Sequence, residues 1–308
     1  MLLFQAPLSP SLIIGSDIVM SMRFALAAIL FSGIVLIRSG PVWAQTGRRS
    51  PSQPLLQSQT ANDIGGTRRH IVLYGEENDP PYAYLTGAVM TGAYTDILRH
   101  AAARLPQYDI EFAGVPFKRG IEMLQRGEIM AFYPPYLDPK RSWVDRYSVP
   151  ILDESVVVIC TDQFARNRVL TDYPFDYIGA RFGNTSGYKL VGEDLFEMAR
   201  LHEVTLEEAH STGINLKRLL AGRIDCYVND RQATATALAE LGFDRADLAG
   251  KIVETAVLGA HQGAIAYAPF DADKWPYRDE FARALDAVLM QMHKDGVIDQ
   301  ILQSYRIY

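Results

Sequence analysis

Short apolar runs alternate with helical patterns of apolar residues from residue 71 to the end of the chain. The apolar runs predict strands at residues 71–74, 110–112, 129–133, 156–160, 177–182, 204–206, 224–228, 252–257 and 264–267. Apolar residues that recur three and four positions apart predict helices around residues 97–105, 216–220, 281–292 and 298–305. This alternation of strands and helices predicts an α/β fold with mostly parallel sheets.

The N-terminus departs from this pattern and is typical of a secretory signal peptide. A basic start precedes an apolar run over residues 24–37, and a V-x-A cleavage site ends at Ala44. The run has 14 residues, whereas a transmembrane anchor needs about 20. We therefore assign residues 1–44 to a cleaved signal peptide. Within this segment, Met20 or Met22 is the expected true translation start. If translation starts further upstream, an uncleaved anchor is the alternative.

The segment that follows the signal, residues 45–69, is rich in Ser, Gln, Pro, Gly and Arg and has no apolar period. We expect a disordered leader there. No cysteine lies near the cleavage site, so the protein is expected to be free in the periplasm rather than lipid-anchored. The two cysteines, Cys160 and Cys226, lie in apolar runs. Either they form one disulfide in that oxidising compartment, or they are two buried small residues.

Composition and charge narrow the class of protein. With 48% hydrophobic and 21% charged residues, the chain has the balance of a globular protein. A formal net charge of −6 argues against a nucleic-acid partner, which would call for a basic patch. The sequence has no G-x-S-x-G, Walker A or H-E-x-x-H motif. His202 and His210 have acidic neighbours but flank a predicted strand, so we expect neither a metal site nor a cofactor.

Short motifs follow one another in a fixed order along the chain. They occupy residues 71–84 (a strand, an acidic residue and Pro-Pro-aromatic), 92–97, 115–121, 125–129, 137–141 with 147–150, 183–186, 221–230 and 292–298. Together they resemble the bacterial extracellular solute-binding proteins of family 3, the amino-acid-type receptors of ABC importers. The resemblance covers residues 70–308.

The resemblance implies a two-lobed periplasmic-binding-protein fold of type II, with a ligand cleft between lobes joined by two crossing strands. Lobe one would hold residues 70–153 and 263–308, and lobe two residues 154–262. Hinge closure of the lobes would bury the ligand. The implied function is capture of a small polar solute, an amino acid or a related carboxylate, without chemistry. The implied partner is the membrane permease of an ABC importer, and we expect a monomer.

The resemblance also implies a site for a zwitterion, with one charged residue from each lobe. Arg141 matches the arginine that binds the ligand carboxylate, a role that suits its planar donors. Asp230 matches the aspartate that accepts the ligand ammonium. Thr185 matches a residue that assists the carboxylate, and Asn184 and Ser186 lie in the same anion-binding turn. Structural roles are the alternative for each: a surface ion pair for Arg141, a strand end for Asp230 and an ordinary turn for the others.

Three more residues are expected at this site. Tyr82 would be an aromatic platform under the ligand. Glu76, at the carboxyl end of the first strand, would suit a basic group of the ligand. Residues 133–136 depart from the family pattern, because Pro134 and Pro135 have no N–H to donate, and Tyr136 would then donate instead.

Two other functions are compatible with the same fold. Some relatives are periplasmic enzymes that dehydrate prephenate-like acids, and Glu76, Glu154 or Asp230 could supply the acid or base. The protein could also present its closed form to a separate membrane sensor. We expect a receptor without enzymatic activity, because no catalytic motif accompanies these residues.

Overall fold

The computed structural model describes residues 68–307. Its strands are β1 (Arg69–Glu76), β2 (Asn78–Asp79), β3 (Ala83–Thr86), β4 (Val89–Thr91), β5 (Tyr108–Val115), β6 (Ala131–Tyr133), β7 (Arg146–Tyr147), β8 (Leu152–Thr161), β9 (Arg181–Thr185), β10 (Thr205–Ala209), β11 (Cys226–Asp230), β12 (Ile252–Gly263) and β13 (Ala266–Tyr267). Its α-helices are α1 (Ala93–Ala102), α2 (Phe117–Gln125), α3 (Asp162–Ala165), α4 (Gly192–Arg200), α5 (Thr212–Leu220), α6 (Arg231–Glu240), α7 (Arg245–Leu248), α8 (Arg278–Lys294) and α9 (Val297–Ser304). The predicted signal peptide, residues 1–44, and the predicted leader up to residue 67 lie outside the described residues.

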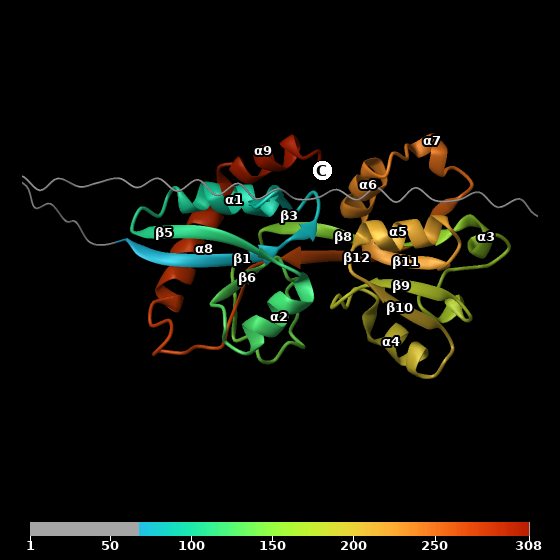
Figure 1. Cartoon of the computed structure of the whole chain (residues 1–308), viewed down its shortest axis with the longest axis horizontal. Helices are drawn as coiled ribbons and strands as arrows, with labels where there is room; N and C mark the ends of the chain where they lie inside the picture. The colour runs from blue at the N-terminus through green and yellow to red at the C-terminus, as the bar shows by residue number, and fades with distance from the viewer. Residues whose placement is uncertain (1–67, 308) are drawn as a thin grey trace, which may run out of the picture. The chain divides into compact units, whose positions relative to one another are not determined.

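The first five-stranded sheet has the order β5-β1-β6-β13-β7. The strand β1 is parallel to β5 and β6, whereas β13 is antiparallel to β6 and β7. Helices α1 and α8 cover one face of this sheet, where Ile97, Phe281 and Leu285 are buried (Figure 1). Helix α2 covers the other face, where Leu124 packs in one cluster with Phe132. We call this sheet and its helices lobe one.

The second five-stranded sheet has the order β10-β9-β11-β8-β12. It is covered on both faces as well (Figure 1). Leu195 and Met198 of α4 are buried in the cluster on one face. Leu216 and Leu219 of α5, together with Ala237 of α6, are buried on the other. We call this sheet and its helices lobe two.

Two long strands join the lobes. The strands β8 and β12 are antiparallel partners along their length. Leu152 pairs with Gly263 at one end, and Thr161 pairs with Ile252 at the other. At the first end, Tyr136 of lobe one forms a β-bridge with Gly263, and the Ile151 backbone N–H donates to the Gly263 carbonyl at 2.8 Å. The second end belongs to the sheet of lobe two. The paired strands therefore enter and leave lobe two side by side, as two crossing strands.

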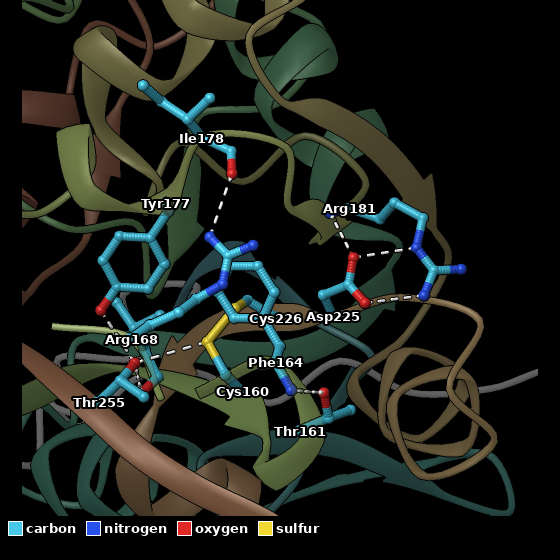
Figure 2. Close-up of a disulfide and its surroundings, with 11 residues drawn as sticks. Cys160, Thr161, Phe164, Arg168, Tyr177, Ile178, Arg181, Asp225, Cys226 and Thr255 are labelled. Atoms are coloured by element: carbon cyan, nitrogen blue, oxygen red, sulfur yellow. Dashed lines mark hydrogen bonds and ion pairs between the residues drawn. A yellow bond between two sulfur atoms is a disulfide. The ribbon is translucent and has the colours of Figure 1, made fainter. Parts of the chain in front are cut away.

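The two cysteines form a disulfide inside lobe two (Figure 2). Cys160 on β8 and Cys226 on β11 are direct partners in the antiparallel ladder. Of the two interpretations left open by the sequence, the structure therefore has the disulfide. Beside it, Asp225 pairs with Arg181 at 2.7 Å and fixes the start of β11 against β9 (Figure 2).

Three features differ from the sequence-based expectations. Each large sheet has two parallel and two antiparallel pairings rather than mostly parallel ones, because the chain runs out and back through the crossing strands. The strand expected over residues 177–182 begins only at Arg181, because residue 177 ends a short 3-10 helix over residues 175–177 that follows Pro174. The small sheet β2-β3-β4 was not predicted, since its strands have two to four residues and carry no apolar period.

Candidate ligand cleft

A cavity of about 260 Å³ lies where lobe one, lobe two and the crossing strands meet. Lobe one contributes Glu76, Asp79 and Phe117, among others, and lobe two contributes Tyr188 and Asp230. The volume lies near the lower end of the range of ligand pockets, which is about 300–1,000 Å³. A solute of amino-acid size fits it better than a peptide.

Glu76 is the last residue of β1 and reaches the cavity floor from lobe one. The Tyr188 hydroxyl of lobe two donates to the Glu76 carboxylate, with both oxygens at 2.8 Å. The pKa of the Glu76 carboxyl is raised to about 8, chiefly by burial and to a lesser extent by the charges of Glu154 and Glu77, while the hydrogen bond from Tyr188 opposes the shift. The rings of Tyr188 and Phe117 are 4.7 Å apart, so the lobes touch beside this carboxyl.

Asp230 occupies the matching place in lobe two, as the last residue of β11. Its carboxylate accepts from the Ala233 backbone N–H at 2.8 Å, so it also caps helix α6. The Tyr82 hydroxyl of lobe one donates to the same carboxylate oxygen at 3.0 Å. Burial raises the pKa of Asp230, and these hydrogen bonds oppose the shift. Tyr82 is not among the residues that line the cavity, and in this structure it supports Asp230 and packs on Tyr94.

Glu154 lies on the crossing strand β8 and faces the cavity. The hydroxyls of Tyr94 and Tyr136 both donate to its carboxylate, the second at 2.7 Å. Burial raises the pKa of Glu154, and the charges of Asp230 and Asp79 raise it further. The expected donor Tyr136 therefore lies at the cavity, where its hydroxyl holds a carboxylate of the protein.

Asp79 is the fourth carboxylate of the cavity, and it differs from the others in having no hydrogen-bond donor for its side chain among the described residues. It ends the short strand β2 and is 8% exposed. Burial raises its pKa, and the charges of Glu76 and Asp230 add to the shift. An unsatisfied, buried carboxylate on a cavity wall is a group that a ligand can satisfy.

Arg141 lines the cavity too, but its guanidinium has partners within lobe one. Its Nη1 donates to the Tyr136 carbonyl at 3.1 Å, and its Nε lies 3.6 Å from a carboxylate oxygen of Asp138. The side chain is 12% exposed. Asp145, a carboxylate close to Arg141 in sequence that could have formed the surface ion pair named above as the alternative, pairs with Arg278 instead.

The remaining predicted residues are Asn184 and Thr185, which end β9, and Ser186 in the turn that follows; none of the three lines the cavity. The Thr185 hydroxyl is 2.8 Å from the hydroxyl of Tyr227. The Asn184 amide donates to the Tyr188 carbonyl at 3.0 Å, and Ser186 donates to Glu208 at 2.9 Å. This turn therefore holds Tyr188 in place.

Sequence reasoning missed Asp79 and the donors Tyr94 and Tyr188. It considered Glu154 only as a possible acid or base. One sequence signal could have indicated that Glu154 is buried. It lies two residues from both Leu152 and Val156, so all three side chains share the buried face of this part of β8. Asp79 had no such signal, since a two-residue strand before two prolines carries no period.

Two α/β lobes that are joined by a pair of strands around a common cavity define the class of two-lobed binding proteins. A sequence model of the bacterial extracellular solute-binding proteins, family 3, matches residues 71–307. The chain belongs to this family. No curated protein matches the chain by sequence.

Solved structures share the fold. An ancestral arginine-binding protein bound to arginine has a TM-score of 0.62 at 18% identity, covering 78% of this chain and 99% of its own. The substrate-binding protein of an amino acid ABC transporter has a TM-score of 0.59 at 17% identity, covering 77% and 98%. An ancestral amino-acid-binding protein, a precursor of cyclohexadienyl dehydratase, has a TM-score of 0.58 at 17% identity, covering 77% and 96%.

Between residues 68 and 307, no helix has the length and apolar character to cross a membrane. In the same part of the chain, no three His, Cys, Asp or Glu side chains are placed to hold a metal ion.

Proposed function

We propose that this protein is the exported receptor of an ABC importer, and that it captures a small solute with a cationic group between its lobes and passes it unchanged to a membrane permease. The observation that carries this proposal is the cavity with carboxylates from both lobes, Glu76 and Asp79 on one side and Asp230 on the other. A ligand that contacts both sides favours the closed arrangement of the lobes.

The position of the carboxylates supports this proposal. Glu76 and Asp230 each end a central strand of their sheet, and ligands of α/β proteins bind outside the carboxyl ends of strands. The ammonium half of the expected zwitterion site thus has several acceptors. Family membership and the shared fold of an amino acid ABC transporter's substrate-binding protein support export to the periplasm and an importer partner.

The direct test is a thermal-shift panel on protein that has been unfolded and refolded to remove bound solute. The panel holds basic, neutral and acidic amino acids, dicarboxylates, amines and prephenate. A ligand at 100 times its Kd stabilises by about 2.7 kcal/mol, which is roughly 5–10 °C for a protein of this size. We expect such shifts with cationic members of the panel only.

Two variants make the test specific. Asp230→Asn keeps a side chain that can cap α6 but removes its charge, so it should fold and lose most of the shift. Asp273→Asn is the matched control, because Asp273 is exposed and outside the cavity lining. Shifts with acidic or neutral solutes alone, or equal shifts in both variants, would refute a receptor for cations.

A dehydratase is the second candidate function, because a carboxyl with a pKa of about 8, such as Glu76, holds its proton at neutral pH and could donate it. Recovering the ligand after incubation separates the two functions. An intact ligand supports the receptor, and a consumed one supports the enzyme. A sensor partner would instead be revealed by ligand-dependent binding to a membrane sensor.

A further inference from the structure

The cavity wall carries several buried acidic groups without basic partners. Four carboxylates face the cavity from positions that are at most 8% exposed, namely Glu76, Asp79, Glu154 and Asp230. Among residues 68–307, none of the four has a Lys, Arg or His nitrogen within ion-pair distance. The two lysines of the lining, Lys140 and Lys189, are exposed. Buried carboxylates are normally paired with a cation, so these four leave that role to a ligand.

The hydrogen bonds within the cavity do not change this charge. Tyrosine hydroxyls hold three of the carboxylates: Tyr188 bonds Glu76, Tyr82 bonds Asp230, and Tyr94 with Tyr136 bonds Glu154. A neutral donor fixes the direction of a carboxylate but leaves its charge uncompensated. Asp79 has not even a neutral donor among the described residues, and its carboxylate lines the cavity.

The cavity offers little to a ligand carboxylate. Arg141, which is less exposed than the two lysines of the lining, contacts Asp138 and the Tyr136 carbonyl. Pro134, also in the lining, has no N–H to donate. The hydroxyl of Thr185 is bonded to Tyr227. A ligand carboxylate would therefore lie among four carboxyl groups, and the only guanidinium donors open to it are those of Arg141 that Tyr136 and Asp138 do not take.

We propose that the solute carries at least two cationic groups and no carboxylate, as an α,ω-diamine or an amino-guanidine does. One cationic end would contact Glu76 and Asp79 of lobe one, and the other Asp230 of lobe two. This inference rests on the proposed receptor function and names its class of solute. Compared with a single ammonium, two cationic ends leave fewer buried charges without a partner.

Matched pairs of compounds test the inference. Calorimetric titration at pH 7.5 compares arginine with agmatine, lysine with cadaverine and ornithine with putrescine, because each second compound lacks only the carboxyl group. Butylamine, which has one cationic end, is compared with putrescine. We expect the decarboxylated member of each pair to bind at least tenfold more tightly, and putrescine to bind at least tenfold more tightly than butylamine.

The variant Asp79→Asn adds a structural readout. Since Asp79 has no side-chain donor within the described chain, the change should leave folding intact and weaken diamine binding at least tenfold. Asp273→Asn is again the control. Circular dichroism and the thermal midpoint of the free protein verify folding in both variants.

The outcomes separate this inference from the function on which it rests. If the amino acid of a pair binds as tightly as its decarboxylated partner or more tightly, the inference is wrong and the receptor stands. Equal binding of butylamine and putrescine, or unchanged binding in Asp79→Asn, also overturns it. If no compound of any pair and no other member of the panel binds, the receptor function falls with it.

Discussion

The affinity for a cationic solute should rise with pH, and Glu76 sets the range. In the free protein, burial raises the pKa of the Glu76 carboxyl from 4.5 to about 8. A cation bound beside it favours the ionised form, so binding below pH 8 must release this proton. If the pKa in the complex falls below 6, the affinity should increase about 50-fold between pH 6 and pH 8.

The groups around Glu76 determine how much of this change belongs to it. Tyr188 donates to the carboxylate, and the charges of Glu154 and Glu77 raise its pKa. His261 is in the same cavity, but burial lowers its pKa, so it is neutral over most of this range. The variant Glu76→Gln should therefore lose about one released proton, and the other cavity carboxyls should account for what remains.

Calorimetric titration with putrescine at pH 6, 7 and 8, in two buffers of different ionisation enthalpy, measures the affinity and the number of protons released. The exposed residue Glu203 provides the control Glu203→Gln, which should keep the slope of the parent protein. An affinity that is constant or falls from pH 6 to pH 8 would refute the reasoning. So would an equal proton release in Glu76→Gln and the parent.

The same shift predicts how the free protein responds to pH. The folded protein holds a proton on Glu76 between pH 4.5 and about 8, where the unfolded chain has lost it. The free energy of unfolding should therefore fall as pH rises through this range. A saturating cation lowers the pKa of Glu76 in the folded protein, so the free energy of unfolding should fall less with pH in the complex than in the free protein.

Two further predictions concern stability. Replacing Cys160 and Cys226 by serine opens a loop of 66 residues and should lower the free energy of unfolding, measured by urea titration, by about 4 kcal/mol. Neither cysteine lines the cavity, so the Kd for the solute should change less than about threefold. In Gly263→Ala the new Cβ would lie 1.7 Å from the Tyr94 hydroxyl, which should cost about 1–3 kcal/mol, whereas Gly213→Ala in the open part of α5 should not destabilise. An unchanged urea midpoint for the serine variant would contradict the disulfide prediction. Equal thermal midpoints for the two alanine variants would contradict the glycine prediction.

The sequence was sufficient for the parts of the fold that repeat a period. The strand at residues 71–74 and the helix at residues 281–292 were predicted from apolar spacing, and the structure has them in β1 and α8. Apolar spacing reports which side of an element is buried, and it does not report the direction of pairing. The antiparallel half of each sheet was therefore beyond it.

The candidate site shows the same limit. Glu76 was expected at the cavity because it ends a strand, and strand ends converge in α/β folds, whereas Asp230 was expected there from the family resemblance. Tyr188 could not be predicted there, since its place depends on the turn after β9 and on contact with lobe one. The state of Arg141 could not be predicted either, because Asp138, three residues away, takes part of its donor capacity only in the folded turn.

Two hydrogen bonds join the lobes, and their donors lie in opposite lobes. Tyr82 of lobe one donates to Asp230 of lobe two, and Tyr188 of lobe two donates to Glu76 of lobe one. Each lobe thus supplies one carboxylate and the neutral donor for the carboxylate of the other. Closing the empty cavity takes these carboxyl groups out of water without supplying a cation, so each either stays charged in the interior or takes up a proton, as Glu76 does, and both disfavour the closed state. A cationic solute supplies the missing charge at the moment when the tyrosines complete the hydrogen bonds, so recognition of charge and closure of the lobes are one event.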